Sequence, residues 1–132
     1  MCLPALAAAE DRCPWLNRAT AGGVLGGAVR MTVTPTSCQF VHEGSELLIE
    51  VQPASQPHAA CESDSEALKA IGNEAVACAY RGKPGWVAEQ VVGRVRDQTF
   101  LVRISRHDPQ APAKVLREKA CDMAEQVAGS LF

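Results

Sequence analysis

The fold is constrained most tightly by one stretch, SCQFVHEGSELLIEVQ, which spans residues 37–52. It predicts a hairpin with strands over residues 37–42 and 46–52 and a turn at residues 43–45. In the returning strand the apolar residues Leu47, Ile49 and Val51 share one face. The polar residues Glu46, Glu50 and Gln52 share the other. This alternation is typical of an antiparallel sheet with one buried face and one face in water.

Two elements are expected before the hairpin. Residues 16–25 form a predicted helix, because Asn17 is a favourable N-cap and Gly26-Gly27 would end it. From Val29 the apolar period changes to two, which predicts a strand that Pro35 ends.

Five elements are expected after the hairpin. Residues 63–70 predict a short helix, because Ser63 and Glu66 have the spacing of a capping box. Strands are predicted over residues 74–80, 86–95 and 99–106. Residues 113–131 predict a long amphipathic helix whose apolar stripe is Leu116, Ala120, Met123, Val127 and Leu131.

This order favours an α+β fold, an antiparallel β-sheet with the N- and C-terminal helices packed on one face. The 132 residues suit one domain, which we assign to residues 10–132. Residues 1–9 are apolar and small and precede charge, which indicates a signal-peptide remnant or a disordered N-terminus. An Ala-rich helix is the alternative for this segment.

Composition excludes two classes of protein. The net charge of −2 gives no basic field for nucleic acid, so we expect no nucleic-acid partner. No apolar run approaches the roughly 20 residues of a transmembrane segment. The chain has six aromatic residues and six cysteines, which favours a domain held by bridges rather than by a densely packed core.

The cysteines indicate the compartment. Beyond the first nine residues they are scattered, without a C-x-x-C pair, at Cys13, Cys38, Cys61, Cys78 and Cys121. This spacing does not predict a zinc ribbon or a thioredoxin-like site. It favours disulfides and therefore an extracytoplasmic location, periplasmic or secreted. A cytosolic protein with several buried thiols is the alternative.

Three stretches carry a resemblance to a known group of proteins. They are residues 13–27, with a cysteine, a capped helix and a glycine stop, then Ser37-Cys38-Gln39-Phe40, and residues 71–75 leading to 99–103. With the terminal helix, these resemble small secreted or lipid-anchored bacterial cell-envelope domains of unknown function, including the extracellular sensor domains of mycobacterial serine/threonine kinases. The resemblance implies a PsbP-like α/β/α sandwich, an envelope location, a binding or sensing role and a disulfide between Cys13 and Cys38.

The other cysteines leave two pairings open. Cys61 and Cys78 flank the predicted short helix, and their bridge would tie down the Pro-rich loop before it. Cys121 would then be a buried free thiol beside the core stripe. The alternative joins Cys121 to Cys78 or Cys61.

No catalytic constellation is visible. His42, His58 and His107 lie in predicted turns, loops or strand ends, without the helical spacing of a metal site. The glycines of residues 22–27 lack the Lys-Ser/Thr of a phosphate loop. We therefore expect no catalytic residues, no metal and no cofactor.

Charge is unevenly distributed along the chain. Residues 43–74 hold seven acids and one lysine, whereas residues 81–119 hold nine bases and four acids. The second stretch, which also holds Arg103, contains the candidate ligand-binding residues Arg81, Lys83, Trp86, Arg94 and Arg96. They form either a solvated face or a basic strip for an anionic envelope polymer, a lipid or another envelope protein.

Two functions follow. The first is an extracytoplasmic, non-catalytic binding or sensor-like module of the bacterial cell envelope. The alternative is an enzyme, or an accessory subunit of an envelope enzyme, with a site assembled only in the fold. A deep pocket of perturbed titratable groups would favour the enzyme, and a shallow groove with Trp86 and arginines would favour binding.

Overall fold

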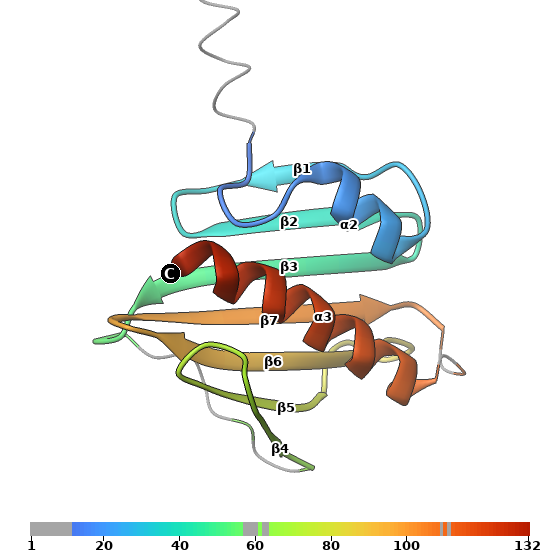
Figure 1. Ribbon diagram of the computed structural model, residues 1–132. Coiled ribbons are helices and arrows are strands. Elements are labelled where there is room, and N and C mark those ends of the chain that lie inside the picture. Colours follow the sequence, from blue (N-terminus) through green and yellow to red (C-terminus); the bar gives the residue numbers. More distant parts are fainter. Residues whose placement is uncertain (1–11, 57–60, 62–63, 109, 111) are drawn as a thin grey trace, which may run out of the picture.

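The computed structural model describes residues 12–56, 61, 64–108, 110 and 112–132. Within them, seven antiparallel strands form one sheet in the order β1-β2-β3-β7-β6-β5-β4. Helices α2 and α3 cross the same face of the sheet (Figure 1). The bounds are α2 Arg18–Leu25, β1 Arg30–Val33, β2 Ser37–His42, β3 Ser45–Pro53, β4 Glu66–Leu68, β5 Glu74–Tyr80, β6 Val87–Val95, β7 Gln98–Arg106 and α3 Ala113–Leu131. The predicted α+β fold is confirmed.

The hairpin of residues 37–52 forms the centre of one half of the sheet. β2 pairs with β3, and the opposite edge of β3 pairs with β7 in antiparallel register. Leu47, Ile49 and Val51 are buried under the helices, as the alternation predicts. The other face of the sheet, which holds Glu46, Glu50 and Gln52 of β3, we call the open face.

Helix α2 has the termini that the sequence predicts. The Asn17 side chain accepts a hydrogen bond of 2.7 Å from the backbone N–H of Thr20, which caps the first turn. Gly26 ends the helix with φ of 103°, a conformation that glycine adopts without steric cost. Ala21 and Leu25 are buried, and α2 packs on β2 and β3.

Helix α3 supplies most of the helical layer. Its predicted stripe is largely confirmed, because Leu116, Ala120, Met123 and Val127 are buried against the sheet. Leu131, at the end of the stripe, is half-buried and packs against the same core. The helix lies over β5, β6 and β7, whereas α2 covers the other half of the sheet (Figure 1).

The helix predicted over residues 63–70 is wrong. Its described part contains the edge strand β4, which pairs with β5 from Glu66 to Leu68. Ser63 lies outside the described residues. Nucleation of a helix is unfavourable, and a helix this short has too few hydrogen bonds to compensate for it. The edge of β5 instead offers backbone hydrogen-bond partners to an extended segment.

Two disulfides attach flanking segments to opposite faces of the sheet. Cys13 bridges Cys38, which lies on the helix-covered side of β2, and Cys61 bridges Cys78 across a sequence separation of 17. Cys78 lies in register with Gln90 on the open face. Cys121 is a free cysteine, so the alternative pairings through Cys121 are not formed. Cys2 lies outside the described residues.

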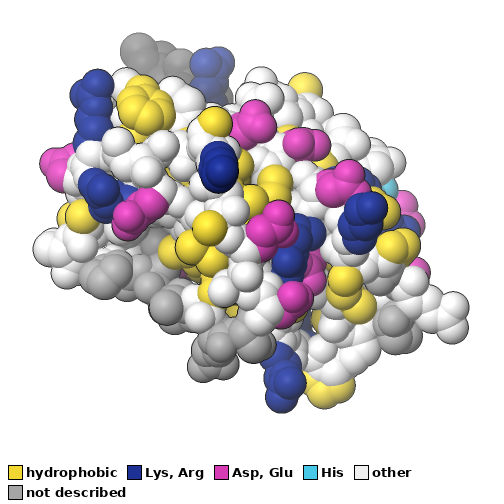
Figure 2. All heavy atoms as spheres, turned by 60° about the horizontal axis from the view of Figure 1, so that its bottom comes forward, with side chains coloured by type: hydrophobic (Ala, Val, Ile, Leu, Met, Phe, Trp, Pro, Cys, Tyr) yellow, Lys and Arg dark blue, Asp and Glu magenta, His cyan; other side chains and the backbone are white. Residues whose placement is uncertain are grey.

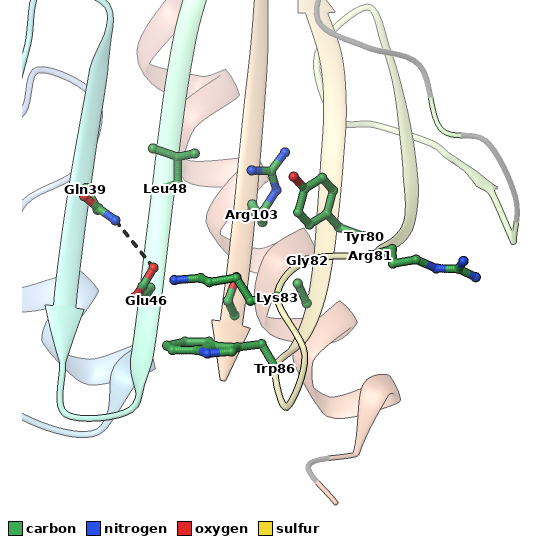
Figure 3. Close-up of a pocket in the computed structure, with 11 residues that line it drawn as sticks. Gln39, Glu46, Leu48, Tyr80, Arg81, Gly82, Lys83, Trp86 and Arg103 are labelled. Carbon is green, nitrogen blue, oxygen red and sulfur yellow. Dashed lines mark hydrogen bonds between the residues drawn. The ribbon is translucent and has the colours of Figure 1, made fainter. Parts of the chain in front are cut away.

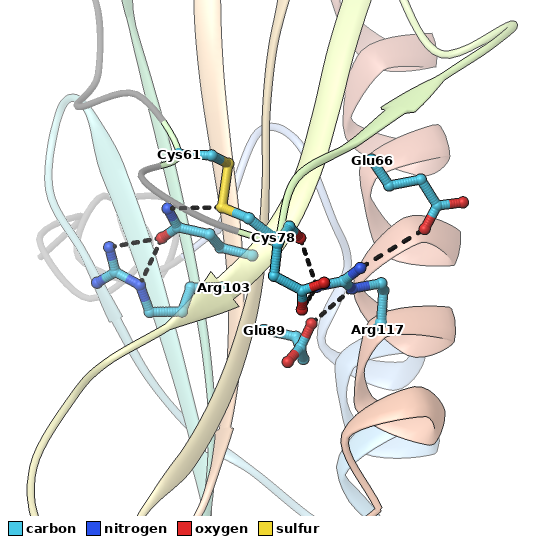
Figure 4. The surroundings of a disulfide bond; sticks show 8 residues. Cys61, Glu66, Cys78, Glu89, Arg103 and Arg117 are labelled. Atoms are coloured by element: carbon cyan, nitrogen blue, oxygen red, sulfur yellow. Dashed lines mark hydrogen bonds and ion pairs between the residues drawn. A yellow bond between two sulfur atoms is a disulfide. The ribbon is translucent and has the colours of Figure 1, made fainter.

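The segment around Cys61 and β4 is held on both sides of the sheet (Figure 4). On the open face it is joined to β5 by the Cys61–Cys78 bridge. On the helix side, Arg117 of α3 bonds the backbone oxygen and the carboxylate of Asp64 and lies 3.6 Å from Glu66. The segment is therefore anchored around the edge of the sheet by one covalent and one ionic attachment.

Gly93 of β6 is expected to tolerate no side chain. It lies opposite Phe100, and a Cβ atom there would lie 2.5 Å from the Phe100 ring and 2.8 Å from the backbone oxygen of Glu74. Gly93→Ala should therefore lower the free energy of unfolding by about 2 kcal/mol, as overpacking of a core does. Chemical denaturation measures the change.

Gly23→Ala is the matched control, because nothing lies within 4 Å of a Cβ atom at this position in α2. There the change should stabilise the protein by up to about 1 kcal/mol through helix propensity. Equal effects of the two substitutions would contradict the close approach of Phe100 to Gly93.

Candidate functional site

A groove of about 390 Å³ lies on the open face. Two rows of side chains that cross the sheet from strand to strand form most of it. The register gives the first row as Gln39, Leu48, Arg103, Gln90 and Cys78, and the second as Val41, Glu46, Ser105, Ala88 and Tyr80. In the second row the small residues Ser105 and Ala88 stand between Glu46 and Tyr80, which leaves the hollow.

Arg103 lies at the centre of the groove (Figure 3). Its Nε and Nη2 atoms donate hydrogen bonds of 3.1 Å and 3.0 Å to Oε1 of Gln90, and its guanidinium lies 3.5 Å from the centre of the Tyr80 ring. Gln90 is buried and also donates to Sγ of Cys78. The guanidinium is thus positioned by a neutral amide that is itself fixed beside the disulfide (Figure 4).

Burial lowers the pKa of Arg103 below its ordinary value, outweighing the opposing influence of Tyr80 and Glu50. Among the residues that the structure describes, Arg103 forms no salt bridge. A half-buried cation without a bonded carboxylate is costly to maintain in a folded protein. Such an arrangement is typical of a site where an external anion completes the charge balance.

The turn between β5 and β6 supplies the second cation. Nζ of Lys83 lies 4.7 Å from the centre of the Trp86 ring, whose other neighbour is the His107 ring, stacked at 5.1 Å. Figure 3 shows Lys83 extended along Trp86 in the direction of β3. The cation–π contact holds the ammonium over the groove without neutralising its charge.

One carboxylate, that of Glu46, lines the groove across from Arg103. Oε1 of Glu46 accepts a weak hydrogen bond of 3.5 Å from the Gln39 amide. Glu46 is half-buried, and no salt bridge to it is found within the described part of the chain. The groove therefore presents the Arg103 cation and the Glu46 carboxylate from opposite sides, and the Lys83 side chain extends across it (Figure 3).

The structure brings only some of the predicted ligand residues together. Arg81, Lys83 and Trp86 line the groove, although the Arg81 side chain points away from it (Figure 3). Arg94 lies at the far end of β6 and Arg96 in the turn that follows it, so the basic strip is not continuous. Both already have internal partners there.

Those partners are specific. Nε of Arg94 lies 3.6 Å from Glu74, and its Nη1 donates to the backbone oxygen of Arg96. The Arg96 guanidinium lies 5.9 Å from the centre of the Phe132 ring. Sequence reasoning did not identify Glu46, Tyr80 or Gln39 as groove residues. The alternation placed Glu46 on the water face, but no local signal showed that β3 pairs with β7.

The described histidines and Cys121 do not form a reactive cluster. Nδ1 of His42 donates to the backbone oxygen of Ala28, and its Nε2 lies 3.1 Å from Glu43. Burial raises the pKa of the Cys121 thiol above its ordinary value, which disfavours the reactive thiolate. Within the described residues, no group of three or more His, Cys, Asp or Glu side chains could hold a metal ion. His58 lies outside those residues.

The surface seen from the β4 edge carries both signs of charge. Figure 2 shows acidic and basic side chains interspersed over this face, with apolar side chains between them. The acidic and basic halves of the sequence meet here, because Arg117 pairs with Asp64 and Glu66. The sequence-level charge asymmetry is thus partly cancelled in the fold.

Comparisons with known proteins identify no relative: no protein-family model, curated protein or solved structure matches the chain significantly. A search of the described helices for one both long and apolar enough to cross a membrane found none.

Proposed function

We propose that the chain is a non-catalytic binding module of the bacterial cell envelope, and that the groove on its open face binds an anionic ligand. The two disulfides support an extracytoplasmic domain, because such bridges persist in oxidising compartments. The resemblance to small secreted or lipid-anchored envelope domains is part of this proposal.

Arg103 is the observation that carries the proposal. Its guanidinium is half-buried and bonded to an amide and an aromatic ring, while Lys83 is held on Trp86. Within the described residues neither cation forms a salt bridge, although the Glu50 carboxylate attracts Arg103. A guanidinium fork matches the geometry of a carboxylate or phosphate group, and partial burial strengthens that attraction relative to water.

The shape of the groove supports binding rather than catalysis. Strand side chains and a surface turn form an open groove with Trp86 and two arginines in its lining, Arg81 and Arg103. Among its described lining residues, Ser105 and Glu46 belong to adjacent strands, and no hydrogen bond between them activates the hydroxyl. The groove thus offers charge and aromatic surface more than an acid–base pair.

Arg103→Met is expected to weaken anion binding by at least about tenfold, since a charged hydrogen bond contributes about 1.5–3 kcal/mol. Isothermal titration against tetragalacturonate, polyphosphate and phosphatidylglycerol vesicles measures the change. Lys83→Met, in the exposed turn, should weaken the same binding without lowering the melting temperature.

Arg94→Met is the matched control, because Arg94 lies at the far end of β6, outside the groove lining. It should leave affinity unchanged. If no probe binds, or if Arg94→Met weakens binding as much as Arg103→Met, the groove is not the site.

A further inference from the structure

The polarity of the groove restricts the kind of anion that it can hold. Arg103 lies on one side and Glu46 with Gln39 lies on the other, and the Lys83 side chain extends from the turn toward Glu46 (Figure 3). A ligand that fills the hollow must place an anionic group near Arg103 and a hydrogen-bond donor near Glu46. A second anionic group at that position would be repelled by the carboxylate.

The hollow between these two poles has a partly apolar floor. Ala88 is buried beside Ser105, Leu48 is half-buried, and the Tyr80 ring is 38% exposed. This floor suits a ring with C–H groups on its face and hydroxyl groups around its edge. The amide of Gln39 and the hydroxyl of Ser105 can each donate or accept a hydrogen bond at that edge.

A phosphate-rich ligand fits less well. Polyphosphate offers acceptors on every side and few donors for Glu46. An amino group would suit Glu46 by charge, but the Lys83 ammonium already extends toward β3, the strand that carries Glu46 (Figure 3). Hydroxyl groups satisfy the carboxylate without adding charge of either sign.

We propose that the groove binds an acidic carbohydrate, with the carboxylate of a uronic acid at Arg103 and its ring hydroxyls at Glu46 and Gln39. This inference rests on the proposed anion-binding function and narrows it to one ligand class. Affinity comes from the charged contacts, and discrimination against other anions comes from Glu46.

The test asks whether one substitution raises or lowers the affinity for each of two ligands. Glu46→Ala should weaken binding of tetragalacturonate several-fold, because it removes a charged acceptor, and should strengthen binding of polyphosphate, because it removes a repulsive charge. Titrations at 0.15 M salt limit the effect of long-range attraction, since the Debye length is then about 8 Å. Glu125→Ala, on the exposed side of α3, is the control and should change neither affinity.

The neutral sugar maltotetraose isolates the role of the anionic group. It should bind at least about tenfold more weakly than tetragalacturonate, and Arg103→Met should reduce this difference markedly. If Glu46→Ala strengthens binding of both anions, the carbohydrate assignment is wrong but the anion site stands. If no anion binds in an Arg103-dependent way, the proposed function fails with it.

Discussion

Arg117→Met should lower the free energy of unfolding by about 3–5 kcal/mol, the cost of breaking a buried ion pair from one side. Nε of Arg117 donates to Oε1 of Glu89 at 2.6 Å, and Glu89 is 2% exposed on the helix-covered face of β6. The substitution would leave that carboxylate buried without its cation. Chemical denaturation at neutral pH measures the loss.

The mutual dependence of the pair is visible in the protonation of Arg117. Burial alone would lower the pKa of the guanidinium, but the hydrogen bond and charge of Glu89, with those of Asp64, raise it above its ordinary value. The arginine therefore remains charged at neutral pH. Mutation of Arg117, rather than its deprotonation, is therefore the way to remove the positive charge that Glu89 needs.

Two variants make this prediction specific. The double substitution Arg117→Met with Glu89→Leu removes both charges and should recover most of the lost stability, because an apolar pair of similar volume replaces a buried ion pair at little cost. Arg94→Met breaks the exposed pair with Glu74, where the effect should stay below about 1 kcal/mol. If Arg117→Met costs no more than Arg94→Met, the buried pair does not stabilise the fold.

Loss of the Cys13–Cys38 bridge should have an effect of similar size. The bridge spans a sequence separation of 25 and ties the segment before α2 to β2. In the chain-entropy model a loop of this length contributes about 3.5 kcal/mol, so Cys13→Ser should lower the free energy of unfolding by that amount. Hydrogen exchange in α2 should rise most, because the helix is short and contains two glycines.

Cys121→Ala is the control for this experiment, because Cys121 is unbridged and half-buried. It should cost less than about 1.5 kcal/mol, as small changes of buried volume do. A reducing agent should destabilise the unaltered protein and the Cys121→Ala variant equally. An unchanged free energy of unfolding in Cys13→Ser would show that the bridge contributes nothing to stability.

Local interactions explain what the sequence alone determined. The alternation of Leu47, Ile49 and Val51 predicted the strand and its buried face, and Asn17 and Gly26 predicted both ends of α2. The stripe of residues 116–131 predicted the core face of α3. Each of these features depends on residues within one or two turns or along one strand, and such patterns can be followed without the rest of the chain.

The segment at residues 63–70 shows where local reasoning failed. Its capping pattern favoured a helix, but Glu66 instead pairs with Arg117 of α3, and its backbone pairs with Ala77 of β5. The partners come from elements well after it in the chain. Tertiary contacts therefore outweighed a weak local preference.

Only the tertiary structure decided the candidate site. Strand order placed β7 between β3 and β6, so that Arg103 came beside Gln90 and across the groove from Glu46, while Arg94 and Arg96 were carried to the far end. Period-two alternation states which face of its strand a residue occupies, but not which strands lie beside it. The scattered cysteines that form the disulfides are visible in the sequence, whereas the groove exists because a particular strand order aligned two rows of side chains across the sheet.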